Sequence, residues 1–208
     1  MIIAIDGPAA SGKGTLARRI ARELAVPYLD TGSLYRAVGL LTLRRGGNPA
    51  DATDAIAAAN ALKIHEFSPQ DLRSEEAGNA ASKVAAIAGV RAALLAYQRQ
   101  FAAQPGGAVM DGRDIGTVVC PDADAKIFVT ASLAVRVQRR IKELRDKGES
   151  VNEQRVWDDM AARDERDSDR AHSPLKPADD AFVLDTSELN ADEAFARAKA
   201  FIVSKKKT

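Results

Sequence analysis

The N-terminal segment joins a short apolar run to a glycine-rich loop and the start of a helical pattern. The run is Ile2–Ile5, and the loop that follows reads Gly-Pro-Ala-Ala-Ser-Gly-Lys-Gly-Thr. Its glycines let several backbone N–H groups point inward, the helix adds its positive N-terminal end, and Lys13 brings an ammonium group to the outer phosphates of a ligand. A glycine-rich turn without a ligand would leave Lys13 unexplained, because the helix dipole disfavours a cation at a helix start. The segment therefore predicts a strand, a phosphate-binding loop and a helix that together hold a nucleoside triphosphate.

Every residue of this loop is a candidate for binding the triphosphate, which we take to be ATP. These residues are Gly7, Pro8, Ala9, Ala10, Ser11, Gly12, Lys13, Gly14 and Thr15. The simplest pattern places Ser or Thr directly after the lysine, whereas Gly14 intervenes here, and this form looks like that of the nucleoside-monophosphate kinases. By analogy with other phosphate-loop sites, Thr15 is the candidate protein contact to Mg²⁺.

Composition limits the size and class of the protein. With 208 residues, 46% of them hydrophobic, the chain can bury one sizeable core but hardly two independent domains. Its 30 basic and 29 acidic residues give a formal charge of +1, which provides no global field to attract nucleic acid or an anionic membrane. Cys120 is the only cysteine, which excludes an intramolecular disulfide and a cysteine metal cluster. With no signal peptide and no apolar run approaching about 20 residues, we expect a soluble cytoplasmic protein without nucleic-acid or membrane partners.

Short apolar runs alternate with helical patterns along most of the chain. The expected strands are Ile2–Ile5, Tyr28-Leu29, Ala108–Met110, Lys126–Val129 and Phe182–Leu184. The expected helices are Thr15–Ala25, Leu34–Arg45, Ser132–Arg145 and Ala191–Val203. This alternation predicts an α/β fold with a parallel sheet covered by helices on both faces, in which ligands bind at the carboxyl ends of the strands.

Two stretches interrupt the alternation. Residues from about 46 to 104 are rich in alanine and helical in pattern, and a charged stretch runs from Lys147 to Pro177. We interpret the first as an inserted helical flap and the second as a mobile lid. The expected organisation is one structural domain. Its core is formed by residues 1–35, 105–146 and 175–208, its insert by 36–104 and its lid by 147–174.

Polar residues follow the second expected strand. The segment Asp30-Thr31-Gly32-Ser33-Leu34-Tyr35-Arg36 offers a capping side chain for the next helix. Arg36 opposes the dipole of that helix unless an anion lies within reach. The residues themselves leave two readings of Arg36 open, a contact to a phosphate and a surface ion pair.

The third strand ends in Asp111-Gly112-Arg113-Asp114. Charges at the end of a buried strand are costly unless they are used or paired. Arg113 either forms a loop ion pair with one of the aspartates or clamps a phosphate with two hydrogen bonds. In the second case one aspartate accepts a hydrogen bond from an exocyclic amine or a ribose hydroxyl, and Asp111 is a candidate for contacting a bound metal ion. Spacing alone does not separate the roles of Asp111 and Asp114.

A third charged group reads Arg-Asp-Glu-Arg-Asp-Ser-Asp-Arg over residues 163–170. On a helix, Arg163, Arg166, Asp167 and Arg170 would share one face. An exposed helix laced with ion pairs is the plain alternative. Three arginines that converge with one aspartate suit a polyphosphate better than they suit each other, so we favour a lid that closes on phosphates.

Taken together and in this order, these motifs closely resemble those of the bacterial cytidylate kinases. The stretch Asn79–Ser82, the pair Val90-Arg91 and the run Asp111–Val119 add to the phosphate loop and the lid. The resemblance covers essentially the whole chain. It implies a three-layer P-loop core with five parallel strands in the order 2-3-1-4-5, a monophosphate-binding insert and a lid. It also implies a transferase of pyrimidine nucleotide metabolism that uses Mg²⁺ and ATP to phosphorylate CMP, and dCMP, to the diphosphates.

The resemblance also implies roles for individual residues. Cytosine is read by Ser82, Arg91 and Asp114, and the acceptor phosphate is held by Arg36, Arg113 and Arg170. Arg163 and Asp167 match positions near the sugar and the phosphates, and Thr31 stands where the family usually has serine. The residues expected to act in catalysis are Lys13, Arg113, Arg163 and Arg170.

The segment Leu62–Glu76 is shorter than in the longer family members, which carry a small β-sheet there. We predict that this sheet is absent or replaced by helix and loop, and we expect a monomer, because a hinged flap and lid need free surface. Two rival functions stay open: a kinase with another acceptor such as UMP or AMP, and a nucleotide-gated binding module. The arginines placed for an acceptor anion weigh against the module.

Overall fold

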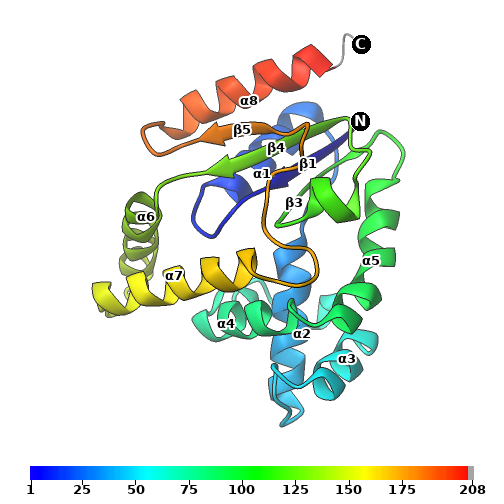
Figure 1. Cartoon of the computed structure of the whole chain (residues 1–208), viewed down its shortest axis with the longest axis vertical. Coiled ribbons are helices and arrows are strands. Elements are labelled where there is room, and N and C mark those ends of the chain that lie inside the picture. The colour runs from blue at the N-terminus through cyan, green and yellow to red at the C-terminus, as the bar shows by residue number, and fades with distance from the viewer. Residues whose placement is uncertain (206–208) are drawn as a thin grey trace. The chain divides into compact units, whose positions relative to one another are not determined.

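The computed structural model describes residues 1–205, and residues 206–208, which the prediction assigns to the core, lie outside it. The chain forms an α/β fold around a five-stranded sheet in the order β2-β3-β1-β4-β5 (Figure 1). The strands are β1 (Ile2–Asp6), β2 (Tyr28–Asp30), β3 (Ala108–Gly112), β4 (Ala125–Thr130) and β5 (Phe182–Asp185). The pairs that β1 forms with β3 and β4, and that β4 forms with β5, are parallel. The predicted fold class and strand order are therefore confirmed.

The helices occur where the patterns predict them, with ends shifted by a few residues. They are α1 (Lys13–Leu24), α2 (Thr31–Arg44), α3 (Ala52–Asn60), α4 (Glu75–Val84), α5 (Ala88–Ala102), α6 (Leu133–Asp146), α7 (Glu153–Ser168) and α8 (Ala191–Lys205). Three short turns complete the elements: η1 (Ile64–Glu66), η2 (Asp71–Arg73) and η3 (Ile115–Val119). The largest shift is at α2, which begins directly after Asp30, so that the strand β2 passes into the helix without a loop.

The chain divides into two compact units. Unit 1 comprises Met1–Leu29 and the chain from Ala102 onward, and unit 2 comprises Asp30–Phe101. The functional division into core, insert and lid stays a prediction.

In unit 1, the sheet is packed on one face by α1 and α8. Ile3 and Ile5 are fully buried there, beside Ile20 of α1 and Ile202 of α8. Figure 1 shows α8 alongside β4 and β5, and α6 beside α7. Because strand side chains alternate between faces, Asp6 lies on the face opposite Ile5, where η3 packs against β1 and β3.

Unit 2 is a helical bundle around α2. Helices α3 and α4 and the turn η2 all pack on α2. Gly39 permits the close approach of α4, because a Cβ at this position would lie 2.6 Å from the Cβ of Ala80. The segment 62–76 contains only η1, η2 and irregular chain before α4 begins, so the predicted absence of the small sheet is confirmed.

Within residues 1–205, no single helix has both the length and the apolar character needed to cross a membrane. Helices α4 and α5 pass that test only when taken together, and they are bent by 103° at the break between them. In α4, Ala77, Ala80 and Val84 are buried in the bundle of unit 2.

Candidate active site

The phosphate loop has a backbone conformation that requires glycine. Gly7 has a φ of +151°, and a Cβ at this position would lie only 2.0 Å from the carbonyl oxygen of Val129. Gly12 has a φ of +91° and immediately precedes α1. L-amino acids rarely adopt such φ values, so these two glycines fix the path of the loop into the helix. The helix N-terminus that follows provides a site suited to phosphate.

Neighbouring elements hold the loop through its carbonyl groups. The carbonyl oxygen of Ser11 accepts hydrogen bonds from Thr186 Oγ1 at 3.0 Å and from Arg139 Nη1 at 3.4 Å. The carbonyl oxygen of Ala9 accepts from Arg136 Nη1 at 3.3 Å. The side chain of Lys13 donates to the carbonyl oxygen of Pro8 at 3.3 Å, which places the ammonium group at the loop itself. The loop is therefore positioned by the protein alone.

Tyr28 and Asp111 lie beside the start of α1. The Tyr28 hydroxyl donates to Asp111 Oδ1 at 2.7 Å, and a Cβ on Gly14 would lie 3.7 Å from Asp111 Oδ2. Thr15, one residue further, is exposed on the first turn of the helix. Mg²⁺ prefers oxygen ligands and keeps several waters, so a hydroxyl and a carboxylate next to a phosphate site suit it. Residues 1–205 contain no cluster of three acidic, histidine or cysteine residues that would hold a metal by itself.

A second charged group lies around Asp167 of α7. Arg113 Nε donates to Asp167 Oδ2 at 2.8 Å, and Arg170 donates to Oδ1 of the same carboxylate. Asp167 is only 1% exposed. Burial raises its pKa, but Arg113, Arg170 and Arg163 together outweigh burial and hold the pKa below its usual value. For Arg113, burial lowers the pKa, and Asp167 more than offsets this, so that the pKa rises. The group therefore stays ionised.

The structure corrects the prediction for this segment in two respects. Helix α7 ends at Ser168, so Arg170 lies beyond the helix and does not share a helical face with the others. Arg166 is exposed and donates to the carbonyl oxygen of Ala162 in its own helix, so it takes no part in the cluster. The third arginine is Arg113, directly after β3, because the buried carboxylate of Asp167 attracts cations from whichever segment brings them close.

An ion pair that no sequence pattern indicates joins α6 to α7. Arg136 donates to both carboxylate oxygens of Asp164, at 3.1 and 2.5 Å, and also to the carbonyl oxygens of Ala131 and Ala9. Its side chain is only 7% exposed. Arginine presents several N–H donors in a fixed plane, so one residue can link α7, the end of β4 and the phosphate loop. Only the spatial proximity of α6 and α7 could have indicated this.

In unit 2, Arg36 forms the ion pair that sequence reasoning left open. Its Nη2 lies 2.5 Å from Asp30 Oδ2, while its Nε is buried and has no hydrogen-bond partner within residues 1–205. A Cβ on Gly32 would lie 2.9 Å from Arg36 Nη1, so glycine leaves the space that the guanidinium fills. The ion pair does not exclude a phosphate contact, because a guanidinium has five N–H donors and Asp30 engages only one side.

The residues expected to read the base in unit 2 are buried or held against an aromatic ring. Ser82 of α4 is 3% exposed, and its hydroxyl has no hydrogen-bond partner among the described residues. The Arg91 guanidinium lies over the ring of Tyr35, 5.5 Å from its centre, and donates to the carbonyl oxygen of Ala85. Thr31 is 3% exposed at the start of α2. Burying a hydroxyl without a hydrogen-bond partner is unfavourable. Such a group is therefore a candidate for binding a ligand.

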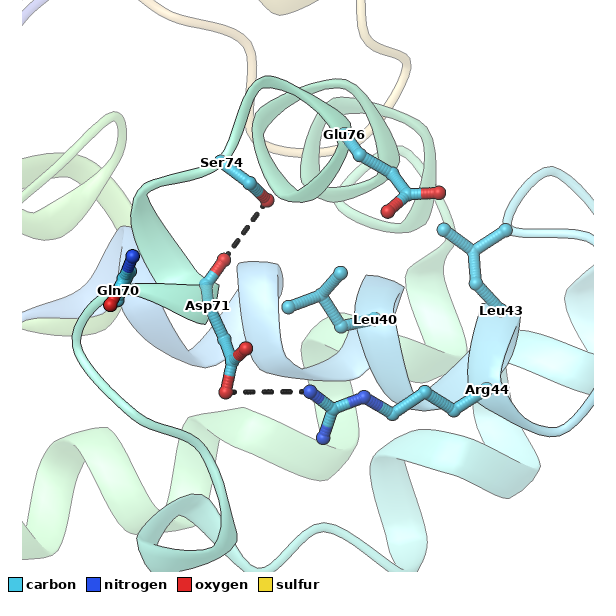
Figure 2. A pocket seen from close by; sticks show the side chains of 7 residues that line it. All are labelled: Leu40, Leu43, Arg44, Gln70, Asp71, Ser74 and Glu76. Atoms are coloured by element: carbon cyan, nitrogen blue, oxygen red, sulfur yellow. Dashed lines mark hydrogen bonds and ion pairs between the residues drawn. The ribbon is translucent and has the colours of Figure 1, made fainter. Parts of the chain in front are cut away.

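Unit 2 also has an open pocket of about 530 Å³ between α2, η2 and α4. Figure 2 shows its lining residues, Leu40, Leu43, Arg44, Gln70, Asp71, Ser74 and Glu76. Within it, Arg44 lies 3.4 Å from Asp71, whose pKa is lowered mainly by a hydrogen bond from the Ser68 hydroxyl. None of the predicted site residues lines this pocket, and its one arginine is already neutralised by a carboxylate.

The fold and the site define a phosphate-loop kinase, in which a triphosphate-binding loop follows β1 and Arg113, directly after β3, joins a buried ion-pair cluster with residues of α7 and the segment after it. Comparison with known families identifies which kinase family this is. The family model "Cytidylate kinase" matches residues 3–203, and the chain belongs to that family.

Curated relatives agree over their full length. The chain is 60% identical to the cytidylate kinase of Paramagnetospirillum magneticum over 208 residues, which cover 99% of both chains. It is 57% identical to the cytidylate kinase of Methylocella silvestris, with 98% of this chain and 94% of that protein covered. Among solved structures, an uncharacterized protein from Eubacterium ventriosum matches with a TM-score of 0.56 at 12% identity, covering 100% of this chain and 99% of that one. This last similarity supports the fold alone.

Proposed function

We propose that this protein transfers the γ-phosphoryl group of ATP directly to CMP, and also to dCMP, giving ADP and CDP or dCDP. Within a chain of the cytidylate kinase family, the buried cluster of Arg113, Asp167 and Arg170 is the observation that carries the proposal. It brings together Arg113, which follows β3, and Arg170, which follows α7, in the same unit as the phosphate loop. A nucleotide switch would need no such second anion site.

On the donor side, the residues Gly7–Thr15 hold the triphosphate. Backbone N–H groups and the start of α1 bind its phosphates. The ammonium group of Lys13 neutralises the negative charge that develops as the γ-phosphoryl group is transferred. The carbonyl contacts from Thr186, Arg139 and Arg136 keep this loop in one conformation, so little reorganisation is needed at the moment of transfer.

Mg²⁺ fits beside this loop, where Thr15 and Asp111 would hold it directly or through water. When bound, it neutralises charge on the donor phosphates. Tyr28 fixes the orientation of Asp111 through its hydrogen bond, which keeps one carboxylate oxygen directed to the start of α1.

On the acceptor side, Arg113 and Arg170 hold the monophosphate of CMP together with Arg36, and Arg163 adds charge at the equatorial oxygens. In the free protein, Asp167 occupies Arg113 and Arg170 and keeps them from being uncompensated buried cations. The acceptor phosphate is already an anion, so no general base is required. The chemistry depends on positioning and charge neutralisation.

For the base, Ser82, Arg91 and Asp114 read cytosine, and Thr31 keeps the hydroxyl of the serine usual in the family. Asp114 is 4% exposed and suited to accept from the exocyclic amine of cytosine, which uracil lacks. We therefore expect Asp114→Asn to lower the preference for CMP over UMP by about tenfold or more while ATP binding changes little. Unchanged relative rates for CMP and UMP in this variant would reject Asp114 as the reader of the base.

We further propose that the enzyme works as a monomer in the cytoplasm. Light scattering coupled to size-exclusion chromatography tests the first part, and a mass twice that of the 22.2 kDa chain would contradict it.

The decisive experiment measures Mg-dependent ADP formation from ATP with CMP, dCMP, UMP, AMP and no acceptor in parallel. Turnover confined to the cytidine monophosphates supports both the reaction and the base assignment. Activity with another acceptor keeps the kinase and overturns the roles of Ser82, Arg91 and Asp114. Slow hydrolysis that no acceptor stimulates would favour the nucleotide-gated module.

A further inference from the structure

Asp6 is a buried carboxylate that neither donor nor acceptor binding accounts for. It is the last residue of β1, directly before Gly7, and is only 5% exposed. Its Oδ1 accepts the backbone N–H of Ile115 and its Oδ2 accepts that of Gly116, each at 2.8 Å. One side chain thus binds the first two amides of η3.

This arrangement is costly for stability. Burial raises the pKa of Asp6 to about 7, opposed by the two amide hydrogen bonds and reinforced by the nearby carboxylates of Asp114 and Asp111. Of the groups around it, Lys126 lies against Gly116 with its methylene chain, but its ammonium group pairs with Asp180. In the part of the chain that the structure describes, no ion pair to Asp6 is formed, and a buried carboxylate in such surroundings is typical of a functional position.

The two hydrogen bonds join two segments whose relative position matters for the reaction. Asp6 is covalently attached to the start of the phosphate loop, and Ile115 is attached to Asp114, next to Arg113. A Cβ on Gly116 would lie 3.5 Å from Asp6 Oδ2, which is ordinary van der Waals contact, and 3.2 Å from the side chain of Lys126. Rotating the carboxylate away from these amides would free the start of η3, which directly follows Arg113 and Asp114.

We propose that Asp6 is a positioning residue that holds the segment Arg113–Gly116 against the phosphate loop, and so sets how the acceptor nucleotide is read. It acts through backbone amides and touches no substrate. The inference rests on the proposed function, since it concerns the acceptor of that reaction.

The first test is Asp6→Asn, which keeps the size of the side chain but turns one acceptor into an NH₂ group facing an amide N–H. We expect the KM for CMP to rise about tenfold and the CMP over UMP preference to fall, while the KM for ATP changes less than about twofold. The matched control is Asp51→Asn at the start of α3, where the carboxylate also accepts from two successive amides, Thr53 and Asp54. This control should leave both KM values unchanged, since asparagine caps helices as well as aspartate does.

A second measurement needs no variant and covers the case in which Asp6→Asn fails to fold. In the wild-type protein, the amide NMR signals of Ile115 and Gly116 should titrate together near neutral pH as the Asp6 carboxylate gains a proton. The ratio of CMP to UMP affinity should fall over the same range as pH is lowered from about 8 to about 6. The ratio cancels the titration of the phosphate, which both nucleotides share.

The outcomes separate the two proposals. Wild-type protein that forms no ADP with CMP refutes the proposed function, whereas the amide titration still reports whether Asp6 binds the turn. An active enzyme whose amides titrate while the CMP to UMP ratio stays constant overturns the positioning role of Asp6. So does an Asp6→Asn variant that raises the KM values for ATP and CMP equally.

Discussion

The phosphate loop and the Asp167 cluster lie in the same unit and both serve phosphate, but they are built from different parts of the chain. The loop binds through its backbone. Gly7 and Gly12 set its path, and its carbonyl groups accept hydrogen bonds from neighbouring elements. The cluster depends on charged side chains, in which Asp167 pairs with Arg113 and Arg170.

The two sites therefore differ in how they are formed before a ligand binds. A backbone site carries partial charges that cannot move away, so it is formed before the triphosphate arrives. A cluster of arginines needs a resident anion, because uncompensated buried cations are strongly unfavourable. Asp167 provides that anion, and an arriving phosphate shares the arginines with it.

The largest effect is expected when the ammonium group of Lys13 is removed from the phosphate loop. We expect Lys13→Ala to lower kcat by about a thousandfold, because the ammonium group acts on charge that develops during transfer. ATP binding should weaken far less, since the backbone still holds the phosphates. Steady-state kinetics and ATP titration measure the two effects. Lys142→Ala, at an exposed pair with Asp146 on α6, is the control and should change neither. Turnover within tenfold of wild type would contradict the role of Lys13.

The next largest effect is expected in the cluster. Asp167→Asn removes the anion that holds Arg113 and Arg170, so the KM for CMP should rise by about tenfold while the KM for ATP stays nearly unchanged. Equal changes in both KM values would show that the two sites are not separate.

The same variant has a pH signature. Because the pKa of Asp167 is lowered in the folded protein, its stabilising effect is present at neutral pH, above the ordinary carboxyl pKa, and is lost as the pH falls through the lowered value. The melting temperature of the wild type should therefore fall more steeply in acid than that of Asp167→Asn. Parallel curves would contradict this assignment.

The smallest expected effect concerns the link between the two regions, the Arg136–Asp164 ion pair. Asp164→Asn should lower kcat by about threefold to tenfold, because α7 loses its anchor at the phosphate loop. Trp157, the only tryptophan and a residue of α7, should report the change through its fluorescence anisotropy. Asp159→Asn, at an exposed ion pair of the same helix, is the matched control. Identical anisotropy in both variants would rule out Asp164 as the anchor.

Much of the fold could be predicted because it depends on local signals. The strand, loop and helix at the N-terminus follow from Ile2–Ile5 and the glycines after it, and the alternation of apolar runs and helical patterns predicts the parallel sheet. Element ends were predicted less well, since helix ends depend on hydrogen bonds that spacing does not show. Residues 163–170 illustrate this, because α7 stops at Ser168 and leaves Arg170 outside the helix.

Sequence patterns were sufficient to predict the phosphate loop, the fold class and the resemblance that named Ser82, Arg91 and Asp114. Each of these depends on residues close together in the chain or on a pattern known as a whole. The tertiary structure determines which polar and charged groups interact: Arg113 with Asp167, Arg136 with Asp164, and the Asp6 carboxylate with the amides of Ile115 and Gly116. The physical reason is that charges attract over a few ångströms in space, and packing of the sheet and helices, not sequence distance, sets which of them come that near.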